Sequence, residues 1–458
     1  MSLGNVRKKK CVVLGLASSG VAVASLLARK GAEVVGSDVL TKEQLPETAE
    51  KLERQGVHIE WGGHPDTLLE GAEYVVISPG VPQNVPVVQR AHERGIPVVG
   101  EIEVASWFCR APIIAVTGSN GKTTTTALLG ELFTGDGWVV TVAGNIGSPF
   151  SDSADSIPPE GIAVVEVSSF QLETIVAFRP EVSVLLNLSP DHLDRYAGYE
   201  AYVAAKARIF ENQDERDVAV LNADDSGVMG LAGQISAKIV PFSIARDLEE
   251  GVFVSGGVLT ARLSGQEEQM CSVEEIRVPG PHNLSNVAAA LAVSKTKGLG
   301  TSKLRKVLRT FAGVEHRLEW VADVGGIAFI NDSKATNVVS VQCALQSFQT
   351  PIILIAGGRE KGTDFGPLRR SVAEKVKLLI LMGEAAPKLR HALSGVVETV
   401  EAGSMEEAVD KAFQSAREGD TVLLSPACAS FDMYHNYEER GARFKDAVRR
   451  IRDREHHG

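Results

Sequence analysis

The sequence predicts an α/β protein built from parallel sheets that helices cover on both faces. Short apolar runs rich in β-branched residues alternate with longer amphipathic stretches along nearly all of its 458 residues. Continuous apolar strands are typical of parallel sheets, because both faces of such a sheet are buried. Several runs end in glycine- or serine-rich loops, and open α/β sheets bind ligands at that edge.

A chain of this length holds about three domains. We expect a Rossmann-like N-terminal domain over residues 1–101, a P-loop ATPase-like central domain over 102–312, and a Rossmann-like C-terminal domain over 313–458. Alternation and glycine pairs between about residues 242 and 276 predict a small antiparallel sheet beside the parallel sheet of the central domain. The predicted strands are 11–14, 33–36, 74–77, 98–99, 113–116, 163–167, 182–186, 327–330, 352–355, 378–381 and 422–424.

Composition and charge argue against several classes of protein. The net charge is −11, whereas a general nucleic-acid binder needs a basic surface. Five scattered cysteines without a CxxC pair indicate neither a disulfide framework nor a structural zinc site. Basic residues 7–10 and the apolar stretch after them resemble a secretory signal, but Gly15 and two serines interrupt that stretch. We therefore expect a cytoplasmic protein without membrane insertion.

The strongest motif is GSNGKTT at 118–124, between a predicted strand and a predicted helix. Glycines there let the backbone wrap a phosphate, which the N–H groups of a helix start would bind. Lys122 can reach the β- and γ-phosphates of a nucleotide, and Thr123 can bind Mg²⁺. The usual first glycine of this motif falls on Val116, so the loop is a shortened variant, and an ordinary glycine turn is the alternative.

Three further side chains could serve this site, and each has a plainer interpretation. Glu166 ends a strand and could bind Mg²⁺, although such a carboxylate is more often simply solvated. His192 could bind a second metal ion, but Asp191 as the N-cap of a helix explains the same segment more simply. Lys206 lies on a predicted helix, where most lysines are solvated, and a functional role would need burial or positive neighbours.

The first section carries an imperfect dinucleotide-binding fingerprint after its first strand. Ala17 replaces the middle glycine of that fingerprint, and Asp38 ends the second strand, where a ribose-binding acid is expected. The segment 78–80 ends another strand and could line the same site. A packed strand–helix turn without a ligand is the alternative.

Polar loops follow three predicted strands of the third section, at 331–337, 357–362 and 425–432. Each could be an ordinary turn. Because all three follow the carboxyl ends of strands, a shared binding site is the better interpretation.

Together these motifs resemble the Mur ligase family of bacterial cell-wall synthesis over nearly the whole chain. The most specific segments are GSNGKTT at 118–124, EVSSFQL at 166–172, DHLDRY at 191–196, HN at 282–283, EHR at 315–317, NDSKATN at 331–337 and LSPACASFD at 424–432. The last two segments point to the family member that adds D-glutamate. The sequence lacks the DNPR motif that marks the diaminopimelate-adding relative.

The resemblance implies an ATP-dependent ligase that adds D-glutamate to UDP-N-acetylmuramoyl-L-alanine through an acyl phosphate, releasing ADP and phosphate. It places the enzyme in peptidoglycan precursor synthesis, and so in cell shape and cell division. ATP and Mg²⁺ are the implied cofactors, and the partners are these small molecules, with no nucleic acid and a monomeric chain. Alternatives are another Mur-type or folylpolyglutamate-type ligase, a nucleotide-switched P-loop ATPase without ligation, and a dehydrogenase.

The resemblance also implies a role for each site residue. The catalytic residues would be Lys122, Glu166, His192 and Lys206. Mg²⁺ would be bound by Thr123 and Glu166, and a second ion by His192 and Lys206, with Lys206 carbamylated by CO₂. ATP would be bound by Gly118, Ser119, Asn120, Gly121, Lys122, Thr123, Thr124, Asn283, Arg317, Asp332 and Lys334. The UDP substrate would contact Ser18, Ser19, Asp38, Gly80 and Asn145, and D-glutamate would contact Thr336, Lys361, Ser430, Phe431 and Tyr437.

One departure from the family concerns the uracil. Val39 and Leu40 follow Asp38, where the family often has Thr or Arg, so fewer polar side chains are available to contact that ring.

Overall fold

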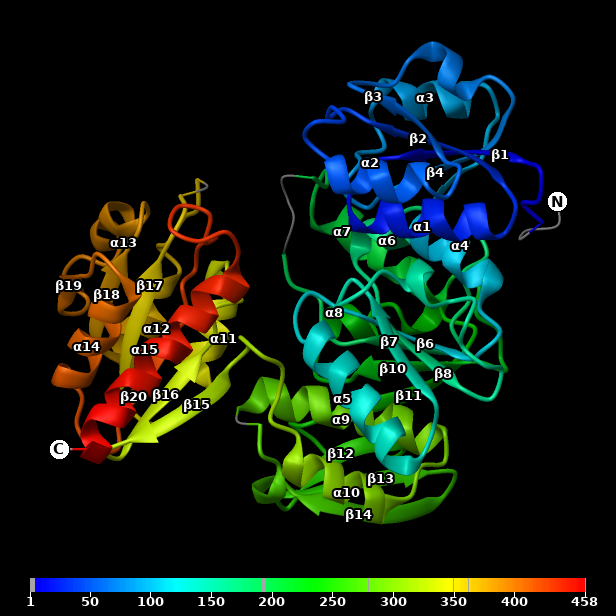
Figure 1. Cartoon of the computed structure of the whole chain (residues 1–458). Helices are drawn as coiled ribbons and strands as arrows, with labels where there is room; N and C mark the ends of the chain where they lie inside the picture. The colour runs from blue at the N-terminus through cyan, green and yellow to red at the C-terminus, as the bar shows by residue number, and fades with distance from the viewer. Residues whose placement is uncertain (1–4, 191–194, 279, 349, 361, 458) are drawn as a thin grey trace. The chain divides into compact units, whose positions relative to one another are not determined.

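The computed structural model describes residues 5–190, 195–278, 280–348, 350–360 and 362–457. The chain forms two compact units, Met1–Val273 with Ser285–Val307, and Glu274–Leu284 with Leu308–Gly458 (Figure 1). Within the described residues there are three sheets, two in the first unit and one in the second. The predicted α/β class with parallel sheets is confirmed.

The N-terminal sheet has five parallel strands in the order β3-β2-β1-β4-β5. Its strands are β1 (Lys10–Leu14), β2 (Glu33–Asp38), β3 (His58–Trp61), β4 (Ala72–Ile77) and β5 (Val98–Gly100). Its helices are α1 (Ser18–Arg29), α2 (Pro46–Glu53), η1 (Asp66–Leu69), α3 (Pro86–Glu93) and α4 (Glu101–Phe108). The strand order reverses between β1 and β4, which is where such sheets bind ligands. The predicted Rossmann-like architecture is therefore present.

The central sheet has nine strands in the order β14-β13-β12-β11-β10-β9-β6-β8-β7. They are β6 (Ile113–Thr117), β7 (Val140–Gly144), β8 (Ile162–Glu166), β9 (Val182–Leu185), β10 (Val218–Asn222), β11 (Lys238–Ser243), β12 (Gly251–Ser255), β13 (Val258–Leu263) and β14 (Gln266–Ser272). The predicted antiparallel strands are β12 to β14, but they extend the parallel sheet and do not form a separate one. Two residue pairs between β11 and β12 make that junction.

Helices α5 (Lys122–Asp136) and α7 (Tyr199–Ala207) follow β6 and β9 and carry the residues of greatest interest. The other helices of this section are η2 (Phe150–Asp152), α6 (Ser169–Leu172), η3 (Arg208–Phe210), α8 (Ser226–Met229), η4 (Ala232–Gln234), η5 (Val273–Glu275), α9 (Pro281–Thr296) and α10 (Thr301–Thr310).

The C-terminal sheet has six strands in the order β15-β16-β20-β17-β18-β19, of which only β15 is antiparallel to its neighbour among the described pairings. The strands are β15 (Glu319–Val324), β16 (Ile327–Asn331), β17 (Ile352–Gly357), β18 (Val376–Met382), β19 (Thr399–Glu401) and β20 (Thr421–Leu424). The helices are α11 (Val338–Gln346), α12 (Leu368–Lys375), α13 (Ala386–Ala392), α14 (Met405–Ser415) and α15 (Tyr437–His457).

Side chains of β17 alternate between two apolar clusters on opposite faces of this C-terminal sheet. Ile352 and Leu354 pack in the cluster that contains α11, α12 and α13, and Ile353 and Ile355 pack in the one that contains α14 and α15 (Figure 1). Burial on both faces explains why the strands read as continuous apolar runs. The strands β16, β20 and β17 are neighbours, so the three predicted ligand loops leave one edge of the sheet side by side.

Two buried carboxylates in the first turn of α4 join the N-terminal section to the central section. Glu103 is fully buried and accepts the backbone N–H groups of Val176, Ala177 and Phe178 at 2.8–3.0 Å. Glu101 accepts the N–H of Ser151 at 2.7 Å, and burial raises the pKa of the Glu101 carboxyl. A buried carboxylate is tolerated only with such partners, so these bonds hold the two sections in register.

We expect Glu103→Gln to lower the melting temperature by about 4–10 °C, because an amide NH₂ would face N–H donors that now bind a carboxylate. The exposed Glu160→Gln is the matched control and should leave the melting temperature unchanged. Calorimetry of both variants beside the wild type tests this, and equal melting temperatures for all three proteins would contradict it.

Candidate functional site

The loop between β6 and α5 has the backbone that a phosphate-binding turn requires. Gly121 precedes α5 with φ at 83°, and a Cβ there would lie 2.2 Å from Asn286 Oδ1. Only glycine satisfies both constraints without strain. The helix that follows is 15 residues long, so its N-terminal N–H groups and dipole favour an anion at this loop.

Side chains that follow β9 hold this loop in place. Asn187 Oδ1 accepts the N–H of Asn120 at 2.8 Å, and Asn187 Nδ2 donates to the Asn120 carbonyl at 3.0 Å. The Ser119 hydroxyl accepts the N–H of Ser189 at 2.9 Å and lies 2.9 Å from the hydroxyl of Tyr202. The sequence analysis missed Asn187 and Tyr202, and the only available signal was an asparagine directly after the apolar run of β9.

Two lysines converge on one carbonyl oxygen of the loop. Lys122 Nζ donates to the Gly118 carbonyl at 2.8 Å and to the Ser119 carbonyl at 2.9 Å, and Lys206 Nζ donates to the Gly118 carbonyl at 2.8 Å. Lys206 is only 2% exposed and its ammonium lies 4.9 Å from the centre of the Tyr202 ring. The interpretation of Lys206 as a solvated surface lysine is therefore wrong, because α7 packs that face inward.

Glu166 lies at the end of β8, directly beside the loop, since it pairs with Val116 of β6. It is 2% exposed, so the alternative of a solvated carboxylate is wrong. Its Oε1 accepts the side-chain N–H of Asn145 at 2.7 Å, and its buried Oε2 has no hydrogen-bond partner among the described residues. A buried carboxylate oxygen of this kind fits a hard cation such as Mg²⁺, as does the buried hydroxyl of Thr123.

Lys206 and a histidine were predicted to bind the second metal ion. His192, with Asp191 and Asp194, lies outside the described residues.

At the N-terminal sheet, three of the predicted UDP residues follow β1 and β4, between which the strand order reverses. Ser18 and Ser19 form the first turn of α1, and Gly80 is exposed just beyond β4. Asp38 is 7% exposed and accepts the backbone N–H groups of Leu16 at 2.6 Å and Leu40 at 2.9 Å. Asp38 therefore holds the loop after β1 with one oxygen and the loop after β2 with the other.

The packed strand–helix turn that was the alternative for this segment is also present. A Cβ at Gly20 would lie 1.8 Å from the Gly15 carbonyl, so α1 packs directly on the turn. The packed turn leaves Ser18, at the start of α1, exposed, and Gly80 is exposed as well. Val39 is 66% exposed and Leu40 is 40% exposed, which gives the edge next to Asp38 an apolar surface.

In the C-terminal unit, two of the residues predicted to bind ATP, Asp332 and Arg317, lie near one another. The buried Asp332 accepts the Ser425 hydroxyl at 2.8 Å and the N–H of Leu318 at 3.3 Å. Burial raises the pKa of Asp332 to about 7, while Ser425 and the nearby Arg317 oppose that rise. Arg317 Nε is buried and has no hydrogen-bond partner among the described residues. This unit thus offers an unused donor beside a carboxyl group.

One of the remaining C-terminal candidates, Lys334, lies beside Tyr437, the first residue of α15. Lys334 Nζ lies 5.3 Å from the centre of the Tyr437 ring, and the ring of His316 lies 6.1 Å away. Phe431 is 57% exposed and Ser430 is buried. The other predicted residues are Asn283, which is buried at the start of α9, Thr336, which is exposed, and Lys361, which lies outside the described residues.

Arg440 on α15 joins the loops and was missed by the sequence analysis. It is 2% exposed, and its guanidinium donates to the Ser333 carbonyl at 2.7 Å, the Ser333 hydroxyl at 3.0 Å and the Cys428 carbonyl at 3.1 Å. Burial lowers the pKa of Arg440 to about 10. The loops after β16 and β20 are thus held by one side chain, which nothing in the sequence distinguishes from the five other arginines of α15.

Models of known protein families match three parts of the chain. They are the "Mur ligase MurD-like, N-terminal domain" over residues 9–100, the "Mur ligase middle domain" over 116–294 and the "Mur ligase, glutamate ligase domain" over 316–428. The chain belongs to the Mur ligase family.

Curated Mur ligases from several bacteria are similar to the chain over nearly its full length. The relative from Pelotomaculum thermopropionicum is 46% identical over 97% of this chain and 98% of its own length. The relatives from Thermoanaerobacter sp. and Trichlorobacter lovleyi are 43% and 45% identical and are covered over 99% and 100% of their lengths. Each of these three proteins is named UDP-N-acetylmuramoylalanine--D-glutamate ligase.

Solved Mur ligase structures share the fold at lower identity. MurF from Acinetobacter baumannii is 17% identical with a TM-score of 0.62, over 95% of this chain and 93% of that chain. MurF from Thermotoga maritima, in complex with ADP, is 16% identical with a TM-score of 0.61 over 99% of both chains. These likenesses establish the same fold.

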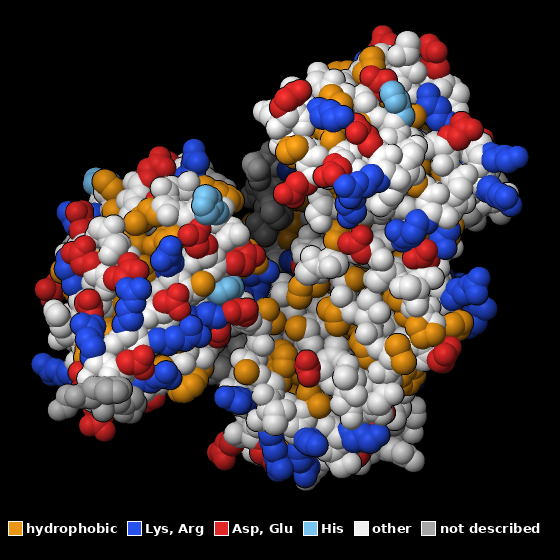
Figure 2. Space-filling view, in the orientation of Figure 1, with side chains coloured by type: hydrophobic (Ala, Val, Ile, Leu, Met, Phe, Trp, Pro, Cys, Tyr) orange, Lys and Arg blue, Asp and Glu red, His pale blue; other side chains and the backbone are white. Residues whose placement is uncertain are grey.

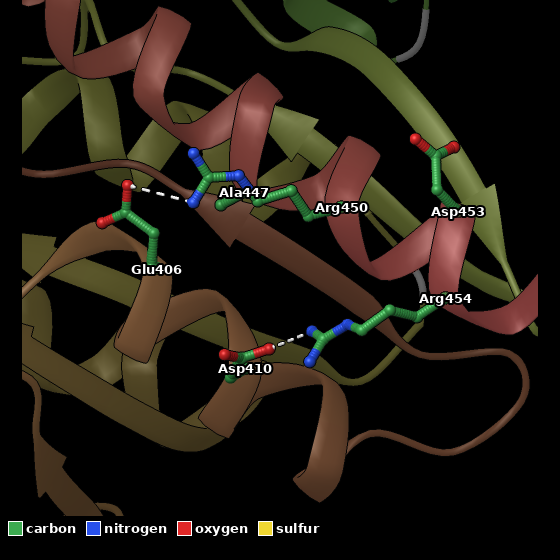
Figure 3. A pocket seen from close by; sticks show the side chains of 6 residues that line it. All are labelled: Glu406, Asp410, Ala447, Arg450, Asp453 and Arg454. Atoms are coloured by element: carbon green, nitrogen blue, oxygen red, sulfur yellow. Dashed lines mark hydrogen bonds and ion pairs between the residues drawn. The ribbon is translucent and has the colours of Figure 1, made fainter.

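None of the predicted site residues lines a groove between α14 and α15 (Figure 3). Arg450 lies 3.9 Å from Glu406 across it, and Arg454 lies 2.5 Å from Asp410. Figure 2 shows acidic and basic side chains mixed over this face. Exposed ion pairs of this kind contribute little, and the arginines are already matched by acids, so we assign the groove no ligand. Within the described residues, no helix is both long and apolar enough to cross a membrane.

The raised pKa of Asp332 predicts how stability depends on pH. Its carboxyl titrates near 7 in the fold and near about 3.9 in an unfolded chain. The unfolded state therefore loses this proton first, so the stability is full below about pH 4 and is lost as pH rises to about 7. The side chain of Asp332→Asn cannot titrate. As the pH rises over that range, the melting temperature of the wild type should therefore fall relative to that of Asp332→Asn.

Calorimetry of the wild type and Asp332→Asn from pH 4.5 to 8 measures this difference. Glu418→Gln, at an exposed position of the same unit, should follow the wild type at every pH. A difference between the wild type and Asp332→Asn that does not vary with pH would show that Asp332 has an ordinary pKa.

Proposed function

We propose that this Mur ligase adds D-glutamate to UDP-N-acetylmuramoyl-L-alanine, with conversion of ATP to ADP and phosphate. The observation that carries the reaction class is the braced phosphate loop, with Lys122 and Lys206 on the Gly118 carbonyl and Glu166 on the neighbouring strand. The choice of D-glutamate rests on the names of the full-length relatives.

A carboxylate needs activation because its leaving group would be an oxide. Transfer of the terminal phosphoryl group of ATP gives an acyl phosphate, which the amine of D-glutamate attacks, and phosphate leaves. Bringing two anions together requires neutralised charge, and Lys122 is positioned to supply it at the loop. Mg²⁺ bound by Thr123 and Glu166 would screen the phosphate oxygens further. The N–H groups from Gly118 to Thr124 would hold the remaining phosphates.

Lys206 has a second part in the proposal, as a carbamate formed with CO₂ that binds a second Mg²⁺ together with His192. Its burial beside Lys122 supports this, because carbamylation replaces one of two neighbouring cations with an anionic oxygen ligand.

We propose that the chain divides into three domains, residues 1–101, 102–312 and 313–458. The remaining predicted residues have the following roles. Asn283, Arg317, Asp332 and Lys334 position ATP, and Ser18, Ser19, Asp38, Gly80 and Asn145 bind the UDP substrate. Thr336, Lys361, Ser430, Phe431 and Tyr437 bind D-glutamate. We also propose that the enzyme works in the cytoplasm. We expect it to be a monomer, because one chain carries every set of residues.

The central test is phosphate release by the purified protein with ATP and Mg²⁺. We expect rapid release only when UDP-N-acetylmuramoyl-L-alanine and D-glutamate are both present, since the acyl phosphate is consumed only by the amine. L-glutamate, L-alanine and diaminopimelate should give little release. Full ATP turnover without an acceptor would favour the alternative of a P-loop ATPase without ligation.

Lys122→Ala serves as the matched variant in that assay. We expect it to reduce ligation by about a thousandfold or more, because one charged contact to the transferring phosphate is lost. Lys51→Ala, at an exposed position on α2, is the control and should behave as the wild type.

Carbamylation of Lys206 predicts that ligation depends on dissolved CO₂. Activity should fall in CO₂-depleted buffer and return on addition of bicarbonate. Lys206→Arg should have low activity that bicarbonate leaves unchanged, because a guanidinium does not form the carbamate. Equal activity of the wild type with and without CO₂, after prolonged depletion, would count against the modification.

A further inference from the structure

An arginine that the proposed mechanism does not use connects the N-terminal and central sections of the first unit. Arg195 Nη1 donates to the Pro79 carbonyl at 2.9 Å, and its Nη2 donates to Glu173 Oε2 at 3.3 Å. Pro79 directly precedes Gly80 at the end of β4, whereas Arg195 and Glu173 belong to the central section. One planar side chain therefore holds the loop at which we place the UDP substrate.

The acid that pairs with Arg195 binds the same loop a second time. Glu173 Oε2 also accepts the side-chain N–H of Gln83 at 3.1 Å. The side chains of Arg195 and Glu173 are only 22% and 17% exposed, so the pair is screened much less than a surface ion pair. Between them, the two side chains reach the loop at both Pro79 and Gln83.

Aromatic rings continue this contact toward the phosphate loop. The guanidinium carbon of Arg195 lies 3.9 Å from the centre of the Phe170 ring, which stacks on Tyr196 with centroids 5.9 Å apart. Tyr196 packs edge-on against Tyr202 at 5.5 Å, and the Tyr202 hydroxyl lies 2.9 Å from the Ser119 hydroxyl. An unbroken series of contacts thus runs from the loop after β4 to the loop after β6.

We propose that Arg195 is a positioning residue that fixes the 78–83 loop against the central section, so that the bound UDP substrate presents its carboxylate at the phosphate loop. This inference rests on the proposed function. It identifies a residue that touches no substrate but sets the distance between two binding loops.

Other contacts hold the N-terminal and central sections together. Arg195 is therefore needed to fix the 78–83 loop and not to join the two sections. Arg29 at the end of α1 and Lys30 directly after it pair with Asp155 at 3.2 and 3.0 Å. The carboxylates of α4 bind the central backbone. Those contacts hold the sections together at other points. Loss of Arg195 would leave the sections docked and free the loop, and a displacement of about 1 Å at a reacting group can cost about a hundredfold in rate.

The test compares Arg195→Ala and Gln83→Ala with Asp155→Ala, which removes a contact between the same two sections elsewhere. Steady-state kinetics with each substrate varied, calorimetric binding of UDP-N-acetylmuramoyl-L-alanine and melting temperatures are measured for all. For Arg195→Ala we expect kcat/KM for the UDP substrate to fall by about 10- to 100-fold. The KM values for ATP and D-glutamate should change by less than about twofold, since the braces of the phosphate loop remain.

Gln83→Ala should show the same pattern more weakly, because it removes one of the bonds to the loop. Arg195→Lys should recover part of the loss, since an ammonium keeps the charge but lacks the planar fork that reaches two acceptors and stacks on Phe170. Asp155→Ala should keep wild-type kinetics even where it lowers the melting temperature.

Two results would overturn the inference. One is an Arg195→Ala enzyme with wild-type kinetics and wild-type affinity for the UDP substrate. The other is an equal kinetic loss in Asp155→Ala, which would assign the effect to docking in general. A wild type that releases no phosphate with D-glutamate would contradict the proposed function instead, and the binding comparison would still decide the role of Arg195.

Discussion

The pair of hydrogen bonds between the Asn187 side chain and the Asn120 backbone fixes the geometry on which the site depends. Because β9 and β6 are neighbouring strands, this pair ties the shape of the phosphate loop to the sheet itself. The Gly118 carbonyl is held as a fixed acceptor as a result, and two lysines from two helices meet on it. A loop free to move would present neither its N–H groups nor these ammonium groups in one arrangement.

The order of the central strands explains how the opposite charge reaches the same place. β8 lies on the other side of β6, and its last residue, Glu166, pairs with Val116 near the end of β6. The two lysines extend from α5 and α7, and the buried carboxylate lies on the neighbouring strand β8. The parallel sheet thus brings together, at one edge, groups that are up to 88 residues apart in the sequence.

Much of this arrangement was predictable because it depends on local pattern. Apolar runs predicted the inner strands of the two terminal sheets and β6, β8 and β9 of the central sheet. GSNGKTT predicted its turn, because buried strands and phosphate loops constrain consecutive residues. The edge strand β3 was not predicted, because the sequence His-Ile-Glu-Trp has no apolar run, and β10 was not predicted although Val-Ala-Val-Leu is apolar. The burial of Lys206 and Arg440 depends on which helix face packs inward, and no short segment of sequence specifies that.

The residues that prediction missed share a physical task. A ligand loop leaves its sheet, so its backbone groups lose their ladder partners and need others. Asn187 supplies them for the phosphate loop, Arg440 for the loops after β16 and β20, and Arg195 for the loop after β4. Each of the three is a side chain with several donors or acceptors that binds backbone at a distance in sequence. The motifs therefore specify what each loop binds, and residues outside the motifs specify where the loop stands.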